Sequence, residues 1–494
     1  MKKLASAAVL LAAAGNVLAG GLFSSNNQNP IFFRQPAQHA IVGVQGAYYD
    51  PAGVALMENG WHLSVGDQMA IQSRQVTGEY MPFMMNVENN GGQSIVYKGK
   101  TFAPVIPNID LAYNHNRWAA SFHFGVVSGG GACSFDDGLG SFEAPMALLP
   151  VAVNTLAGNT VIGGYDADIH FKGNSFAFGG QFNFAYKVID TDRHKLSLSA
   201  GIRLNYMHNS YAGGIFDYRL MMPSMAGAMV PATNALTGIL GSLGLPAPMA
   251  QTFAEKLGGD KEVDCSQNSF AVNPVFGIHY QVGSWNFAAK YEFLTKGEYT
   301  NKTSVNTAGL AQFEDGSKVR SDIPALLAFG AEVDILDNLR AAAGMNIYFD
   351  KSANYGGKQE KLGRNTLEWN LGVEYDINSK WTVSLGSQLT RFDFGENNDY
   401  LTDMSFSLPS WCLGGGFRYW FTDRIGIDVS VFNTFYDKAV KNYADYGNAG
   451  ATYQAALGAV PGVPAEALAK LAVPGSDEFY RTSLSWGIGL VWDF

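Results

Sequence analysis

Apolar and polar residues alternate along most of the chain after residue 60, with a period of two. The last segment shows this clearly, because every second position is apolar: Leu484, Trp486, Ile488, Leu490, Trp492 and Phe494. The intervening positions, such as Ser483 and Ser485, are mostly small or polar. Successive side chains of a β-strand point to opposite faces, so this pattern predicts strands with one apolar face.

Fourteen such segments follow one another along the chain. They lie near residues 61–72, 105–114, 117–128, 171–188, 194–210, 267–281, 284–299, 319–334, 337–350, 364–377, 380–393, 405–421, 424–437 and 482–494. Short connections with turn-forming residues alternate with long ones, of which the longest are 129–170, 211–266 and 438–481. We therefore predict an all-β membrane protein, a 14-stranded antiparallel transmembrane β-barrel with its apolar row toward lipid.

The composition agrees with a barrel and excludes other classes. Charged residues make up 15% of the chain, against roughly 25% in ordinary soluble domains. The mean hydropathy is −0.02, and no uninterrupted apolar stretch after residue 20 is long enough for a membrane helix, which needs about 20 residues. The net charge is −10 and there is no basic run, which argues against nucleic-acid binding.

Both ends of the chain indicate export. Residues 1–19 combine two lysines, a short apolar run and a small-residue cleavage site, as in a signal peptide. The terminal Phe494, with its alternating aromatic residues, resembles the signal that the barrel assembly machinery recognises in bacterial outer-membrane barrels. We therefore expect a bacterial outer-membrane protein, surrounded by the lipids of that membrane.

Residues 20–59 precede the first strand and do not alternate. About 40 residues are too few for an independent core, and a 14-stranded barrel leaves a lumen to be filled. We interpret 20–59 as an N-terminal plug, or hatch, inside the barrel formed by residues 60–494.

Two outer loops are unusually apolar. Residues 220–258 and 451–473 are rich in Ala, Leu and Met and are interrupted by Pro, which predicts short apolar helices. Six residues are candidate contacts for an apolar ligand: Leu220, Met221, Met222, Met225, Leu240 and Leu243. Packing among the loop helices explains the same residues equally well.

The segment Ala47-Tyr48-Tyr49-Asp50-Pro51-Ala52-Gly53 resembles the Asn-Pro-Ala region of the FadL/TodX family. Asp50 stands where the family has Asn, whereas Pro51 and Ala52 match. The resemblance extends to the whole layout: a signal peptide, a plug of about 40 residues, 14 strands, apolar outer loops and a terminal Phe. It implies that the protein is an outer-membrane diffusion channel for hydrophobic compounds, with long-chain fatty acids as the expected substrate. It also implies that the protein needs no cofactor.

The resemblance also implies a mechanism. Substrate is captured on the outer loops, moves to a lumenal pocket and leaves when the hatch rearranges and a kink in the third strand opens the wall. The third strand here ends in Gly129, Gly130 and Gly131, where that kink would fall. Glycines permit a bulge that other residues resist, although the flexible start of a loop would look the same.

Because side chains alternate in direction along each predicted strand, four basic residues are expected to point toward the lumen, where any of them could bind a carboxylate: Arg203, Lys290, Arg340 and Arg418. We expect most of them to pair with lumenal acids or with the hatch. Arg34 and His39 of the hatch could also neutralise lumenal carboxylates.

Other functions have less support in the sequence. An embedded hydrolase would need a nucleophile beside a base such as His123 or His279, and no nucleophile motif accompanies them. We therefore expect no enzyme and no metal site, since Cys133, Cys265 and Cys412 match no metal spacing. Cys133 and Cys265 both fall in predicted loops and could pair. The alternative function is a passive porin or a surface adhesin, and in either case we expect a monomer.

Overall fold

The computed structural model describes residues 22–242, 244–458 and 465–494. The predicted signal peptide, residues 1–19, and Leu243 lie outside the described residues.

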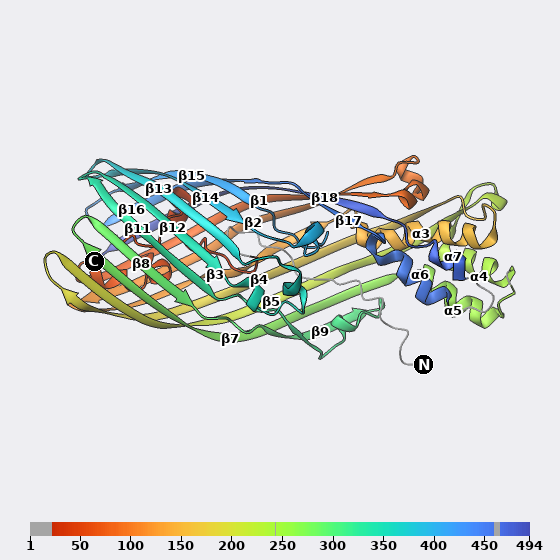
Figure 1. Cartoon of the computed structure of the whole chain (residues 1–494), viewed down its shortest axis with the longest axis horizontal. Helices are drawn as coiled ribbons and strands as arrows, with labels where there is room; N and C mark the ends of the chain where they lie inside the picture. Colours follow the sequence, from red (N-terminus) through yellow and green to blue (C-terminus); the bar gives the residue numbers. More distant parts are fainter. Residues whose placement is uncertain (1–21, 243, 459–464) are drawn as a thin grey trace.

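Fourteen strands close into one antiparallel barrel (Figure 1), which confirms the predicted class and strand number. They are β1 (Gly60–Tyr80), β2 (Ser94–His115), β3 (Trp118–Phe135), β4 (Gly164–Asp190), β5 (His194–Met222), β7 (Lys261–Val282), β8 (Trp285–Glu292), β11 (Leu326–Leu336), β12 (Leu339–Tyr348), β13 (Thr366–Asn378), β14 (Trp381–Arg391), β15 (Ser410–Trp420), β16 (Ile425–Tyr436) and β18 (Gly475–Asp493). The last strand closes the barrel by pairing with the first, from His62 opposite Asp493 to Tyr80 opposite Gly475.

The two ends of the barrel differ. Short turns and the C-terminus lie at one end, the short-turn end, and the helices gather at the other, the long-loop end (Figure 1). Those helices are α3 (Gly140–Ala157), α4 (Ala232–Ser242), α5 (Ala247–Gly258), α6 (Ala449–Leu457) and α7 (Ala465–Ala469). Four short strands extend the wall there: β6 (Ala228–Pro231), β9 (Glu298–Asn306), β10 (Lys318–Arg320) and β17 (Ala439–Tyr443).

Short helical turns complete the element list. Two α-helical turns precede the barrel, α1 (Ile31–Arg34) and α2 (Gly46–Tyr49). The 3-10 turns are η1 (Gly53–Leu56), η2 (Met81–Met85), η3 (Val87–Asn89), η4 (Pro223–Met225), η5 (Ala311–Phe313), η6 (Asp350–Ser352), η7 (Lys358–Lys361), η8 (Glu396–Asn398) and η9 (Tyr446–Asn448).

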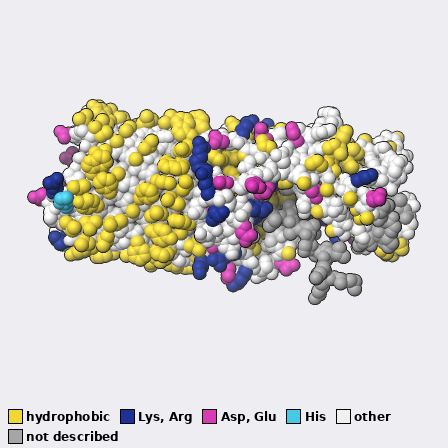
Figure 2. All heavy atoms as spheres, in the orientation of Figure 1, with side chains coloured by type: hydrophobic (Ala, Val, Ile, Leu, Met, Phe, Trp, Pro, Cys, Tyr) yellow, Lys and Arg dark blue, Asp and Glu magenta, His cyan; other side chains and the backbone are white. Residues whose placement is uncertain are grey.

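The outer wall carries a broad apolar band. Hydrophobic side chains cover the barrel toward the short-turn end, and charged side chains gather beyond them (Figure 2). On β4, Phe182 and Phe184 are exposed on the outer face, whereas Gln181 and Asn183 are buried inside. The predicted division into an apolar outer row and a polar inner row therefore holds on this strand.

The predicted long loops are wrong in extent. Strands β3 and β5 continue to Phe135 and Met222, so the connections 129–170 and 211–266 contain much strand. β7 begins at Lys261, and the connection 438–481 includes the first residues of β18. Beyond the band, the outer faces turn polar and the inner faces pack on the loop helices, so the apolar-out alternation that marks a strand is lost.

The three cysteines lie in strands rather than in loops. Cys133 is in β3 and Cys265 is in β7, and both belong to one buried cluster with Phe135 and Phe171. Each of the three is a free, buried thiol. Among the described residues, no helix is both long and apolar enough to cross a membrane.

Candidate functional site

The N-terminal segment, residues 22–59, lies inside the barrel. Helix α1 contacts strands β14, β15, β16 and β18, whereas α2 contacts β2, β3 and β4 across the lumen. The Arg34 guanidinium pairs with Glu374 at 2.5 Å and with Asp428 at 3.1 Å, joining the segment to two wall strands. His39 instead contacts the amide oxygen of Asn346 at 3.0 Å.

The Asp50-Pro51-Ala52 turn is attached to the wall by side chains of β5 and β7. The Asp50 carboxylate accepts from the Gly53 amide at 3.0 Å and pairs with the His279 imidazole at 2.5 Å. The Ser197 hydroxyl donates to the carbonyl of Ala52. The acid at position 50 therefore caps its own turn and also forms a buried hydrogen bond with His279.

A chain of polar contacts continues from this pair. His279 contacts Asn286 at 3.2 Å, and the Asn286 amide donates to Glu332 at 3.0 Å. The other histidine considered as a base, His123, contacts the Asp110 carboxylate at 2.7 Å and the Gln28 amide oxygen at 3.1 Å. The partners of both histidines are carboxylates and amides of the wall and the N-terminal segment.

All four predicted lumenal bases are engaged by acids. Arg203 and Lys290 share Glu292, each at 2.7 Å. They also hold Tyr48, since the Arg203 guanidinium lies 5.0 Å and the Lys290 ammonium 3.9 Å from the ring centroid. Arg340 pairs with Asp376 at 2.6 Å, and Arg418 pairs with Asp428 at 2.7 Å.

The wall is interrupted between β2 and β3. Lys100 pairs with Ser134, and the next pair of the ladder is Ile109 with Phe124. Along this gap, hereafter the β2–β3 gap, β3 also bulges against β4, at Val126–Ser128 and at Ser128–Gly131. Gly129 and Gly131 have φ of +108° and +65°, which L side chains rarely adopt.

The N-terminal segment replaces part of the missing ladder. The Ser25 amide donates to the carbonyl of Val127 at 2.8 Å, and the Gln28 side chain donates to the carbonyl of Val126 at 2.7 Å. On the facing strand, Pro104 and Pro107 lack the amide hydrogens that a ladder requires. The glycines of β3 could be identified from the sequence as the place of a kink, whereas these prolines matter only once β2 and β3 are seen side by side.

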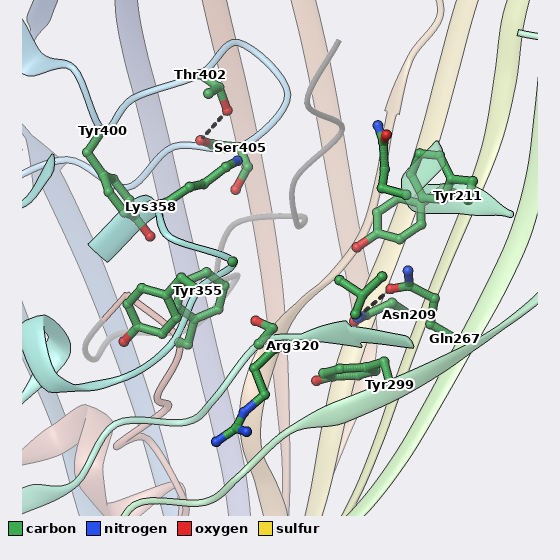
Figure 3. A pocket seen from close by; sticks show the side chains of 16 residues that line it. Asn209, Tyr211, Gln267, Tyr299, Arg320, Tyr355, Lys358, Tyr400, Thr402 and Ser405 are labelled. Atoms are coloured by element: carbon green, nitrogen blue, oxygen red, sulfur yellow. Dashed lines mark hydrogen bonds between the residues drawn. The ribbon is translucent and has the colours of Figure 1, made fainter. Parts of the chain in front are cut away.

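A lumenal pocket of about 220 Å³ lies toward the long-loop end (Figure 3). Six aromatic rings contribute to its lining: Phe23, Tyr211, Tyr299, Phe313, Tyr355 and Tyr400. Lys358 lies at its rim, and burial together with the charges of Lys361 and Lys441 lowers its pKa to about 8. Tyr299 also belongs to a buried cluster that includes Met207 and Val127, so apolar packing connects the pocket to the β2–β3 gap.

A second, mostly apolar pocket of about 190 Å³, the loop pocket, lies among the outer loops. Its walls come from α3, α5, α6, β4, β5, β7 and the loop after β9, with Phe142, Met146, Ile215, Leu257 and Leu310 among the lining residues. None of these was singled out from the sequence, because they come together only when separate loops fold over one another.

The predicted outer-loop contacts lie elsewhere. Leu220 and Met222 are buried in the cluster that packs α3, α4 and α6 together. Met225 is 57% exposed on η4, and Met221 and Leu240 are partly buried. The described residues of this set line neither pocket, and Leu243 lies outside the described residues.

A charged cavity of about 880 Å³ opens at the short-turn end. Arg34, Arg340, Arg418, Glu332 and Glu374 are among its lining residues. Within the described ranges, no group of three or more His, Cys, Asp or Glu side chains could hold a metal ion.

Solved structures with the same fold include three proteins from two genera. A FadL homologue of Pseudomonas aeruginosa matches with a TM-score of 0.60 and 12% identity, over 96% of this chain and 100% of its own. The toluene transporter TodX of Pseudomonas putida gives 0.55 and 12%, over 98% and 100%. The toluene transporter TbuX of Ralstonia pickettii gives 0.51 and 16%, over 95% and 99%.

No family model and no curated protein matches the sequence. The structural likeness shows that the chain has the fold of FadL-type transporters, and the resemblance read from the sequence is confirmed at that level.

Proposed function

We propose that this protein is an outer-membrane diffusion channel for hydrophobic compounds. The observation that carries the proposal is the β2–β3 gap, a break in the wall whose edge is hydrogen-bonded by the N-terminal segment. The apolar band supports insertion in a membrane. The fold shared with two toluene transporters supports an apolar substrate.

The proposed route begins at the long-loop end. An apolar molecule enters the loop pocket, where burial of its surface favours binding by about 25 cal/mol per Å². It then moves to the lumenal pocket, whose Phe23 belongs to the N-terminal segment. That segment acts as the hatch.

Release occurs sideways through the β2–β3 gap rather than through the short-turn end. The cavity at the short-turn end is lined by charged residues as well as apolar ones, so an apolar solute there would displace water from arginines and glutamates, which is unfavourable. The rim of the gap is apolar, because Ala70, Ala103, Ile106 and Val126 pack there. When Ser25 and Gln28 leave the β3 carbonyls, the gap widens toward the membrane.

Long-chain fatty acids are the substrate expected from the sequence, whereas the fold shared with toluene transporters favours smaller aromatic compounds. Uptake assays should therefore use both a labelled long-chain fatty acid and labelled toluene. The cells should make this protein as their only such barrel. The matched variant replaces Asp50, Pro51 and Ala52 together by Ala, Gly and Ser.

We expect protein-dependent uptake of at least one compound, altered by the triple substitution. If neither compound enters through a folded barrel present at the surface, the proposal is wrong. A passive porin would then admit small polar solutes regardless of the triple substitution, and an adhesin would admit none.

A further inference from the structure

The lumenal pocket has the size of a site for a single-ring compound. Its volume of about 220 Å³ is below the roughly 300–1,000 Å³ typical of sites for drug-sized ligands. A long alkyl chain would not fit entirely inside the pocket, and part of it would extend beyond the lining. The space is bounded by aromatic rings from the N-terminal segment, β5, β9 and the loops after β9, β12 and β14.

Four of the rings form two contacting pairs at the edge of the space. Phe23 lies against Tyr355 with ring centroids 4.4 Å apart, and Tyr211 lies against Phe313 at 5.4 Å. Figure 3 shows Tyr355 and Tyr400 on one side of the space, and Tyr211 and Tyr299 on the other. Aromatic surfaces on two sides favour a flat ring through offset or edge-to-face contacts.

The lining is mostly apolar, but polar side chains form part of it. Asn209, Gln267, Thr402 and Ser405 contribute to the wall, and the Tyr355 hydroxyl donates to Asp350 at 2.8 Å. Burying polar groups against a molecule that cannot hydrogen-bond is unfavourable. A ligand with a polar group at one end would satisfy such a wall.

One cation at the rim lacks a counter-charge. Arg320 pairs with Asp322 at 2.5 Å, and the Lys441 ammonium donates to the carbonyls of Asp399 and Leu401. By contrast, no acid among the described residues pairs with the Lys358 ammonium. Its side chain extends over the pocket toward Ser405 (Figure 3). Its charged neighbours Lys361 and Lys441 are also cations, so the rim attracts an anion.

We propose that the lumenal pocket binds a compact aromatic molecule that carries an anionic group, with its ring between the tyrosines and its anion on Lys358. This inference rests on the proposed function, since it names the class of hydrophobic compound that the channel prefers. The lowered pKa of Lys358 agrees with a site whose charge is uncompensated until an anion arrives.

The test is equilibrium binding to the full-length mature barrel in lipid nanodiscs, measured by calorimetry. Three probes separate the features of the ligand: hydrocinnamate has a ring and a charge, hydrocinnamyl alcohol lacks the charge, and nonanoate lacks the ring. We expect hydrocinnamate to bind at least about tenfold more tightly than either of the others, a difference of about 1.4 kcal/mol.

The variant Lys358→Gln should weaken hydrocinnamate binding about tenfold and leave hydrocinnamyl alcohol unchanged. Lys361→Gln, in the same turn but outside the pocket lining, is the matched control: it removes the same charge at a greater distance, so it should weaken hydrocinnamate binding much less than Lys358→Gln and leave hydrocinnamyl alcohol unchanged. Equal or tighter binding of nonanoate, or no effect of Lys358→Gln, overturns the inference.

Uptake of the three probes separates this result from a failure of the proposed function. A barrel that transports nonanoate and hydrocinnamyl alcohol but shows no preference for hydrocinnamate keeps the proposed function and loses the inference. A barrel that binds and transports none of the three, nor toluene or a long-chain fatty acid, loses both.

Discussion

The hydroxyl of Ser128 donates a hydrogen bond to the carbonyl oxygen of Phe23, whose ring lines the lumenal pocket. Ser128 lies in the bulged part of β3, next to the β2–β3 gap. A molecule that displaces the Phe23 ring therefore acts on a residue bonded directly to the edge of the gap. This contact relates occupancy of the pocket to the state of the wall.

The first prediction concerns the glycine at the bulge. In Gly129→Ala the new methyl group would lie 2.4 Å from Cα of Phe176, at a φ of +108°. We expect the free energy of unfolding in urea to fall by at least about 1–3 kcal/mol and uptake to fall with it, because the bulge must shift. Gly180→Ala is the control, since its methyl group would meet nothing closer than 3.7 Å. Unchanged stability and uptake in Gly129→Ala would show that the bulge does not need this backbone conformation.

The second prediction concerns the buried pair between Asp50 and His279. Asp50→Ala should destabilise the protein by about 1–3 kcal/mol, because it leaves the buried His279 ring without its hydrogen-bond partner. Asp50→Asn should be milder, since an amide oxygen can still accept from the Gly53 amide. Thermal unfolding measures both variants. Equal losses would mean that the charge, and not the cap of the turn, determines stability here.

The third prediction is a pH dependence of the loop layer, which we define as α3–α7 together with the strand ends and loops that pack with them at the long-loop end. The hydroxyls of Tyr443 and Tyr446 donate to Asp477 at 2.9 and 2.6 Å. Burial, together with the charge of Asp403, raises the pKa of Asp477 from its ordinary value of 3.8 to about 7. The folded state thus favours the protonated acid, so this stabilisation is complete below about pH 4 and is lost as the pH rises through about 7.

We therefore expect the loop layer to melt at a higher temperature at about pH 5 than at about pH 8, as followed by the near-ultraviolet signal of its tyrosines. Asp477→Asn stays uncharged and should flatten this difference. A wild-type protein that melts at a higher temperature at the higher pH would contradict the prediction.

The fourth prediction concerns capture by the loop pocket. Phe142→Ser removes a ring that stands edge-on to Phe171, with centroids 5.7 Å apart. The substrate concentration for half-maximal uptake should rise about tenfold with the maximal rate unchanged, because only the first binding step loses apolar area. Met225→Ser changes an exposed side chain of the same loop layer and should have no effect. A lower maximal rate without a change in the half-maximal concentration would assign Phe142 to a later step.

The barrel was predictable from the sequence because each segment carries its own evidence. Phe182 and Phe184 face outward and Gln181 faces inward, and this local alternation requires no knowledge of neighbouring strands. The ends of the strands were not predictable in this way. Tyr218 and Leu220 are buried against loop helices, so their strand positions no longer alternate against an apolar exterior.

Pairing between side chains of distant segments could not be predicted from the sequence either. Parity placed Arg340 and Arg418 toward the lumen, but it did not show that Glu374 and Asp428 would neutralise them and also bind Arg34. The β2–β3 gap needs the prolines of β2 to stand opposite the glycines of β3, and that register depends on the assembled sheet. Lys358 could not be singled out from the sequence, because the absence of an acidic partner for it among the described residues depends on three loops together.

The length of β5 determines how far the loop pocket lies from the lipid-facing apolar band. Its 29 residues correspond to about 95 Å of strand at about 3.3 Å per residue, or about 70 Å along the axis at a tilt of about 40°. The apolar band of such barrels is only about 25 Å tall, and the last large exposed apolar residue on β5 is Tyr206. Gly213, Gly214 and Ile215 of β5 line the loop pocket only a few positions beyond Tyr206, so the pocket lies about 20 Å past the apolar band, within reach of molecules that never touch the lipid.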